Sequence, residues 1–142
     1  MKVYLASPLF SIIERELNTS LCTILETSFT VYLPQRDGPL IELDRDSTDS
    51  IHTLKDMAFR SDIDALRSCD VMVAVLDGRA LDEGVCIEMG FAKALGKRII
   101  GVKTDIRVAL PWGNNPMVDG CVDVWVADPL TITEVIHRFV SQ

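Results

Sequence analysis

The sequence lacks the features that mark membrane proteins and nucleic-acid-binding proteins. Its 142 residues contain no apolar stretch as long as a membrane span and no run of basic residues, and the formal net charge is −7. An acidic chain is repelled by the phosphates of nucleic-acid polymers and anionic membranes, so we expect neither as a partner. The short apolar start passes directly into Ser7 and Pro8, without the longer hydrophobic core of a secretory signal.

Cysteine pairs with metal or redox spacing are also missing. No CxxC occurs, and each cysteine stands among apolar residues, at Cys22, Cys69, Cys86 and Cys121. We therefore expect buried thiols in a reducing compartment and a cytoplasmic location. No His/Cys/Asp cluster has metal-ligand spacing, so we expect no metal.

Three common enzyme motifs are absent as well. There is no GxGxxG after the first apolar run, no GxxxxGK[ST] and no GxSxG. A dinucleotide site, a P-loop and a serine-hydrolase elbow are therefore poorly supported. We expect no cofactor, and what remains is a metal-independent reaction carried out by carboxylates.

What is present is an alternation of apolar runs and amphipathic stretches. Strands are predicted over 3–6, 30–33, 71–76, 98–102 and 122–126, helices over about 10–27, 47–67, 82–95 and 131–140, and long loops over 35–46 and 104–119. This order predicts a single domain over 1–142, of α/β class, with a five-stranded parallel sheet covered by helices on both faces. Ligands of such sheets bind beyond the carboxyl ends of the strands.

Glu88 is the most informative residue. At helical spacing its neighbours are Gly84, Val85, Phe91 and Ala92, and a helix of that composition is buried. A carboxylate there loses hydration, which is costly unless it is hydrogen-bonded or paired. Glu88 is therefore either a satisfied structural acid or a working one.

Asp62 is a second acid on an inward face. It is four residues from both Ala58 and Leu66, whereas Asp64 is spaced to pair with Arg60 and Arg67 on the outer face. Hydrogen bonding at a helix end is the alternative explanation for Asp62 and for Glu88. Two acids from helices that flank one strand suit nucleophilic or general acid–base work at a glycosidic carbon.

Of four other positions, two, Asp82 and Tyr4, have both a structural and a functional interpretation. Asp82 is expected to cap the third long helix, and it could also hold a ligand hydroxyl. Asp77 is expected to cap a loop at the ligand edge. Tyr4 is either a core aromatic or a hydrogen-bond donor to a carboxylate. Asn115 lies in a Pro/Gly-rich loop, where asparagine is common for turn reasons alone.

Three segments together resemble the nucleoside 2-deoxyribosyltransferase family. They are Val3–Phe10, Asp62–Val71 and Asp82–Ala92; the last is similar to the family pattern D-x-G-[ST]-x-x-E-x-G-x-A, with Val85 in place of the small hydroxyl residue. The resemblance runs over most of the chain. It implies a flavodoxin-like (Rossmann-like) three-layer sandwich.

The resemblance also implies roles for individual residues. Glu88 matches the nucleophile that attacks C1′ of 2-deoxyribose, Tyr4 the tyrosine that positions it, and Asp62 the aspartate that assists proton traffic at the base. Asp82 matches the aspartate that holds the sugar hydroxyl, and Asn115 an asparagine lent by a neighbouring subunit. The remaining candidate substrate-binding residues are Phe10, Gln35, Ser7 and Gly84.

The resemblance predicts exchange of the base of a 2′-deoxynucleoside through a covalent deoxyribosyl-Glu88 intermediate, with retention. The expected partners are a small-molecule 2′-deoxynucleoside, a free nucleobase and further copies of the chain, as a homo-oligomer (dimer or hexamer). One alternative is an N-glycosidase that hydrolyses 2′-deoxynucleoside 5′-monophosphates. Another, from a different class, is a non-catalytic nucleotide-binding module on the same fold.

Overall fold

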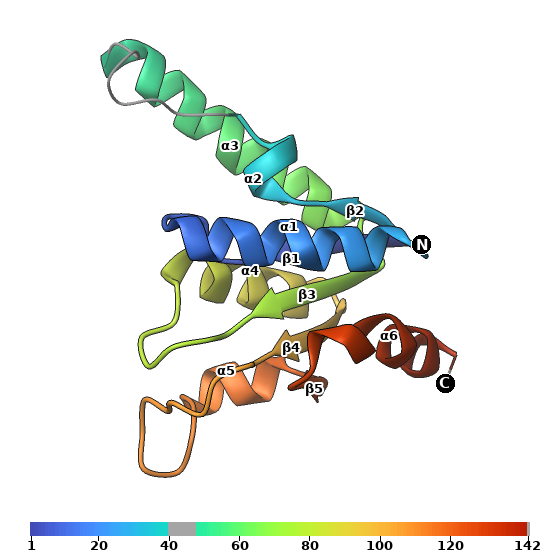
Figure 1. Ribbon diagram of the computed structural model, residues 1–142. Helices are drawn as coiled ribbons and strands as arrows, with labels where there is room; N and C mark the ends of the chain where they lie inside the picture. The colour runs from blue at the N-terminus through green and yellow to red at the C-terminus, as the bar shows by residue number, and fades with distance from the viewer. Residues whose placement is uncertain (40–47, 142) are drawn as a thin grey trace.

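A single parallel sheet forms the centre of the molecule (Figure 1). The computed structural model describes residues 1–39 and 48–141. The strands pair in the order β2-β1-β3-β4-β5, and every pair is parallel. Their bounds are β1 (Lys2–Ala6), β2 (Thr30–Tyr32), β3 (Val71–Val75), β4 (Arg98–Val102) and β5 (Val124–Val126).

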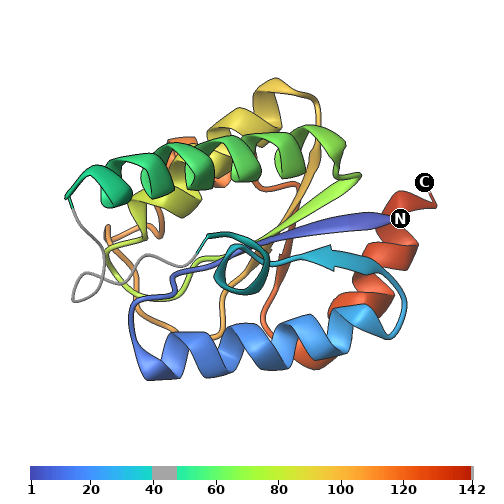
Figure 2. The same ribbon diagram turned by 90° about the horizontal axis from the view of Figure 1, so that it is seen from above.

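Helices cover both faces of the sheet (Figure 2). One face carries α1 (Ile12–Glu26) and α6 (Ile132–Val140). The other carries α3 (Thr48–Ser68), α4 (Glu83–Ala94) and α5 (Pro116–Cys121). The predicted α/β class and five-stranded parallel sheet are confirmed, and the strand order is that of flavodoxin-like folds.

Alternation along the strands divides the core into two layers. In β1, Val3 and Leu5 pack with the layer of α1 and α6, whereas Tyr4 and Ala6 pack with the layer of α3 and α4. This follows from the two-residue period of a strand, which sends successive side chains to opposite faces. Tyr4 therefore reaches the same layer as the two candidate acids.

The predicted long loops contain two short helices that the sequence patterns did not predict. The loop predicted over 35–46 begins with α2 (Pro34–Asp37), and the loop predicted over 104–119 contains the start of α5. Pro34 and Pro116, which the sequence patterns placed outside any helix, each occupy the first helical turn, where the fixed φ and missing N–H of proline are tolerated. Residues 40–47, which include the predicted start of the second long helix, lie outside the described residues.

Other boundaries differ by a few residues. The strand predicted over 122–126 begins at Val124, because Val122 still closes α5 by donating its N–H to the Val118 carbonyl. A 3-10 turn (Pro129–Thr131) precedes α6. No helix in the described ranges is both long and apolar enough to cross a bilayer.

The cysteines only partly match the prediction of buried thiols. All four are free; Cys22 and Cys69 are buried, but Cys86 and Cys121 are partly exposed. Cys86 lies on α4 and lines a surface cavity, which explains why the apolar pattern around it did not lead to full burial.

Strand order determines where a ligand site is expected. β2 lies on one side of β1, whereas β3, β4 and β5 follow one another on its other side. The direction of the strand order therefore reverses at the β1/β3 boundary. A crevice forms outside the carboxyl ends of strands at such a switch point. The loops after β1 and β3, which contain Ser7 and Asp82, lie at this edge.

Candidate active site

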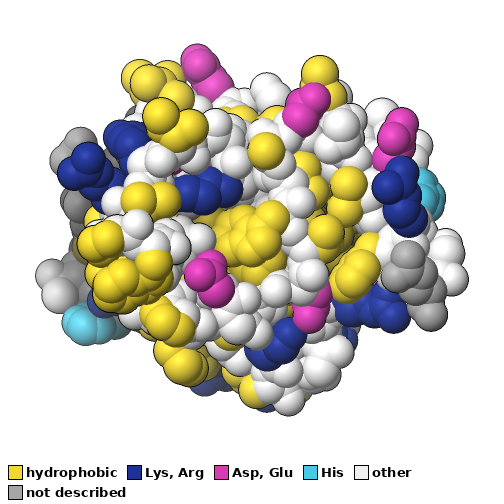
Figure 3. Space-filling model, turned by 90° about the horizontal axis from the view of Figure 1, so that it is seen from below, with side chains coloured by type: hydrophobic (Ala, Val, Ile, Leu, Met, Phe, Trp, Pro, Cys, Tyr) yellow, Lys and Arg dark blue, Asp and Glu magenta, His cyan; other side chains and the backbone are white. Residues whose placement is uncertain are grey.

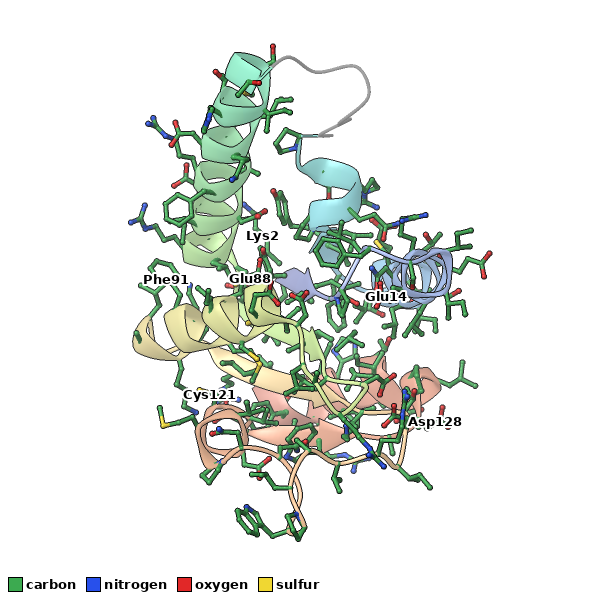
Figure 4. All side chains as sticks on the ribbon, turned by 90° about the vertical axis from the view of Figure 1, so that its left-hand side faces the viewer. Lys2, Glu14, Glu88, Phe91, Cys121 and Asp128 are labelled. Atoms are coloured by element: carbon green, nitrogen blue, oxygen red, sulfur yellow. The ribbon has the colours of Figure 1, made fainter. Side chains whose placement is uncertain are left out.

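Tyr4 and Glu88 form the centre of the candidate site. The Tyr4 hydroxyl donates a hydrogen bond of 2.7 Å to Glu88 Oε1, joining β1 to α4. Tyr4 is fully buried and Glu88 is partly buried. Figure 4 shows Glu88 on α4, in the region where α4, α3 and the sheet meet. The carboxylate that the sequence singled out therefore has a specific donor.

Burial governs the ionisation of this pair. Loss of hydration raises the pKa of Glu88 to about 7; the Tyr4 hydrogen bond opposes the rise, and the charges of Asp62 and Asp82 add to it. Burial, together with the neighbouring Glu88 and Asp62 charges, raises the pKa of Tyr4 above its usual range. The phenol thus keeps its proton and can act as a donor, while Glu88 ionises near neutral pH.

A second hydroxyl–carboxylate pair lies beside the first. The Tyr32 hydroxyl donates to Asp62 Oδ1 at 3.0 Å, and the rings of Tyr4 and Tyr32 stack with centroids 5.4 Å apart. Burial raises the pKa of Asp62, and the Tyr32 hydrogen bond partly offsets this rise. The structure therefore brings Asp62, Glu88 and Tyr4 together, as the sequence predicted for their positions.

Tyr32 is the member of this group that the sequence patterns did not reveal. It is the register partner of Tyr4 in the β1–β2 pair, so both side chains lie on the same face of the sheet. The two tyrosines can be predicted to lie side by side only if β1 and β2 are known to be neighbouring strands. Periodicity within one segment does not contain that information.

Asp82 caps the helix that carries Glu88. Its Oδ1 accepts a 2.9 Å hydrogen bond from the Val85 N–H at the start of α4, as expected for an N-cap. A Cβ at Gly84 would lie 3.1 Å from the same oxygen, so glycine leaves room for this cap. The carboxylate of Asp82 also lies close enough to Glu88 to raise its pKa.

Other predicted site residues are engaged elsewhere. The side-chain amide of Gln35 makes two hydrogen bonds to α1: its oxygen accepts from Asn18 Nδ2 at 2.9 Å, and its nitrogen donates to the Arg15 carbonyl at 3.3 Å. Phe10, which directly precedes the N-cap of α1, is 76% exposed. The Ser7 hydroxyl donates to the Pro8 carbonyl at 3.3 Å. Within the described ranges, no hydrogen bond links these side chains to Glu88.

Asn115 is the N-cap of α5. Its Oδ1 caps α5 by accepting from the Met117 N–H at 2.9 Å. It lines a cavity of about 380 Å³ together with Leu81, Cys86 and Val118. Asn115 therefore has a structural task, and its side chain borders an open cavity.

Two predicted structural residues behave nearly as expected. Asp77 accepts hydrogen bonds from the backbone N–H and the hydroxyl of Thr104, both at 2.6 Å, and so caps the loop after β4. Asp64 pairs with Arg67 at 3.4 Å on the outer face of α3. Arg60, which we expected to pair with Asp64, is instead bonded to Asp56 at 2.9 Å.

The arrangement has the parts of a covalent, carboxylate-based reaction. A nucleophilic carboxylate needs to be ionised and positioned, and a second carboxyl with a raised pKa can hold a proton for a leaving group. Among the residues that the structure describes, no group of three or more His, Cys, Asp or Glu side chains could hold a metal ion.

Comparisons with solved structures agree on the fold. A 2-deoxyribosyltransferase from Bacillus psychrosaccharolyticus is 20% identical, with a TM-score of 0.77 over 94% of this chain and 90% of that one. A conserved protein from Enterococcus faecalis V583 is 24% identical, with a TM-score of 0.77 over 98% of each chain. A CMP N-glycosidase from Clostridium botulinum is 21% identical, with a TM-score of 0.56 over 96% of this chain and 99% of that one.

Sequence comparison identifies the family. No curated protein matches the chain. The family model described as nucleoside 2-deoxyribosyltransferase, however, matches residues 3–129, which include both tyrosine–carboxylate pairs and Asn115. The chain therefore belongs to the nucleoside 2-deoxyribosyltransferase family.

Proposed function

We propose that this protein is a nucleoside 2-deoxyribosyltransferase that exchanges the base of a 2′-deoxynucleoside through a deoxyribosyl-Glu88 intermediate. The observation that carries the proposal is the 2.7 Å hydrogen bond from the buried Tyr4 hydroxyl to Glu88. It gives a desolvated carboxylate a fixed direction, and it favours the ionised form that can attack C1′. Family membership and the fold shared with a 2-deoxyribosyltransferase support the same reaction.

The reaction divides into two displacements at C1′. Glu88 attacks C1′, and the base leaves through an oxocarbenium-like transition state, which the missing 2′-hydroxyl of a deoxy sugar makes easier to reach. A second base then attacks the deoxyribosyl-enzyme from the other side, so the configuration is retained overall. Asp62, whose pKa is raised by burial, supplies and recovers the proton of the base.

The N-terminus of α4 favours a substrate with a free 5′-hydroxyl. Helix N-termini attract anions, but here the carboxylate of Asp82 already accepts the Val85 N–H. A phosphate placed about 4 Å from that carboxylate would be repelled by about 1 to 4 kcal/mol, depending on the local dielectric. Asp82 is better suited to accept a hydrogen bond from a sugar hydroxyl.

The alternative is hydrolysis of a 2′-deoxynucleoside 5′-monophosphate. The observation in its favour is the shared fold with a CMP N-glycosidase, at a lower TM-score than that of the transferase. One experiment separates the two: deoxyinosine and deoxyinosine monophosphate are each incubated with adenine. Formation of deoxyadenosine from deoxyinosine supports transfer, whereas release of sugar phosphate from the monophosphate alone would overturn it.

A non-catalytic binding module is tested by Glu88→Ala. If Glu88 is the nucleophile, the variant loses turnover by several orders of magnitude and still binds a nucleoside. The matched control is Asp64→Asn, which removes an acid from the outer face of α3 and should leave turnover intact. A wild-type protein that binds nucleosides without turnover would favour the binding module.

We also propose that the active form is a homo-oligomer in which Asn115 reaches the site of a neighbouring copy. Large apolar side chains near Asn115 are exposed, with Trp112 at 73% and Met117 at 78%. Figure 3 shows hydrophobic side chains gathered at the centre of the face formed by α5, β5 and α6. Exposed apolar surface of this kind marks interaction sites.

Mixing two inactive variants tests this arrangement. Glu88→Gln and Asn115→Ala each damage one half of a shared site, so mixed oligomers contain some sites with both residues intact. Activity should therefore reappear on mixing and subunit exchange. Activity that never exceeds the sum of the separate variants would contradict a shared site.

A further inference from the structure

Tyr32 is held in a defined geometry that its position on an edge strand does not require. It extends from β2, lies in register with Tyr4, and stacks on that ring with 22° between the ring planes. Its hydroxyl donates to Asp62 Oδ1 at 3.0 Å, across from β2 to α3. The side chain is only partly buried, so the hydroxyl could have remained in water.

We propose that Tyr32 is a positioning residue for base departure: it fixes Asp62 through one carboxyl oxygen and directs the other oxygen toward the base. The inference rests on the proposed function and deepens it. Among the residues that the structure describes, the Tyr32 hydroxyl donates to Asp62 Oδ1, and a carboxyl group has a second oxygen that can face a ligand. The ring stack with Tyr4 places this pair beside the Tyr4–Glu88 pair.

The proton balance of the reaction shows what Tyr32 contributes. As Glu88 forms its bond to C1′, the C1′–N bond breaks and its electron pair goes to the base. The proton of the Asp62 carboxyl moves to a ring nitrogen of the base, and Asp62 becomes a carboxylate. The hydrogen bond from Tyr32 strengthens as this charge develops, because bonds to ionised acceptors are stronger than neutral ones. The incoming base returns a proton to Asp62 when its nitrogen attacks C1′ and releases Glu88.

The groups around the pair are consistent with this role. Burial and the charge of Asp62 raise the pKa of Tyr32, so its hydroxyl keeps the proton that it donates. The ionisable groups that face the Tyr32–Asp62 pair come from β1, α4 and α2; they are Tyr4, Glu88 and Asp37. Two cations on α3 are paired on its outer face, Arg60 with Asp56 and Arg67 with Asp64.

Two matched variants distinguish the effect of the Tyr32–Asp62 pair from that of the Tyr4–Glu88 pair. Tyr32→Phe and Tyr4→Phe each remove one hydroxyl and keep the ring that stacks. Tyr32→Phe should raise the pKa of Asp62, because it removes the hydrogen bond that lowers that pKa, whereas Tyr4→Phe should act on Glu88. Carbon-13 NMR titration of the aspartate carboxyl groups, assigned with Asp62→Asn, measures this directly. An unchanged Asp62 titration in Tyr32→Phe would overturn the inference.

The decisive assay compares donors whose bases do and do not need a proton. A neutral purine donor, 2′-deoxyinosine, is compared with its N7-methylated cation, whose base leaves without protonation. If the wild type accepts only pyrimidines, 2′-deoxyuridine is compared with its 5-trifluoromethyl derivative, whose base is a better leaving group. General acid catalysis contributes about 10²- to 10⁴-fold. We therefore expect Tyr32→Phe to lower kcat/KM about 10- to 100-fold for the ordinary donor and less than about threefold for the activated one.

The control variant identifies the cause of any loss. Tyr4→Phe should slow both donors by similar factors, because Glu88 attacks C1′ in both reactions. If Tyr32→Phe also slows both donors equally, Tyr32 has only a structural role and the inference fails while the proposed function stands. If the wild type exchanges no base with any donor, the proposed function itself fails.

Discussion

Replacing Glu88 with glutamine should make the stability of the fold less sensitive to pH. The pKa of Glu88 is raised from 4.5 to about 7, chiefly by burial. The folded state therefore holds this proton more tightly than the unfolded chain does. The contribution of Glu88 to the free energy of unfolding is fully present below pH 4.5, decreases between pH 4.5 and 7, and is constant above pH 7.

The size of the effect follows from the two pKa values. One pKa unit corresponds to about 1.4 kcal/mol, so the wild type should lose up to about 3 kcal/mol relative to Glu88→Gln across this interval. The substituted glutamine carries no charge and its amide oxygen can still accept from the Tyr4 hydroxyl. The difference between the two proteins therefore isolates the ionisation of Glu88.

Urea unfolding at closely spaced pH values between 5 and 8 measures this difference. Comparison at matched pH cancels the titration of groups that the two proteins share. Asp64→Asn is the control, because it removes one negative charge from an exposed position and should not reproduce the trend. A free-energy difference between wild type and Glu88→Gln that stays constant over this range would refute the idea that Glu88 is a desolvated carboxyl.

Three further substitutions test other contacts of the site and the core. Tyr4→Phe removes the hydrogen bond that lowers the pKa of Glu88, so the acid limb of the pH–rate profile should move to higher pH. Asp82→Ala removes the N-cap of α4 and should lower the free energy of unfolding by about 1 kcal/mol, measured in urea. Gly101→Ala would place a Cβ 2.9 Å from the Trp125 ring; the overpacking should destabilise the fold by about 1 to 3 kcal/mol, seen as a lower Tm with altered tryptophan fluorescence.

The sequence predicted the sheet and the convergence of the two acids because both depend on patterns within single segments. A continuous apolar run such as Val71–Val75 defines a buried parallel strand, and an acid among apolar helix neighbours is conspicuous. The apolar pattern around Glu88 predicted a buried helix, which is only partly right: Glu88 is partly buried, but Ile87 on the same helix is 70% exposed, so α4 is buried on one face. Its donor Tyr4 could be named because the resemblance to the family supplied a long-range pairing.

Other features depended on information that no single segment contains. The Tyr32–Asp62 bond joins an edge strand to a helix 30 residues away, so it follows from strand order and register. The side-chain oxygen of Gln35 accepts a hydrogen bond from the buried Asn18 on α1, so it is not free to bind a ligand. Both short helices that were not predicted begin with a proline. Proline is common in the first turn of a helix and also in loops and after the end of a strand or helix, so the residue alone does not indicate which applies.

Trapping the sugar on the protein tests the role of Glu88 most directly. A slow fluorinated 2′-deoxynucleoside is incubated with the enzyme, which is then analysed by intact mass spectrometry and peptide mapping. A covalent intermediate on Glu88 predicts a mass increase equal to one fluorodeoxyribosyl group, located on the peptide that contains this residue and absent from Glu88→Gln. Base release without any adduct, or an adduct on another residue, would contradict Glu88 as the nucleophile.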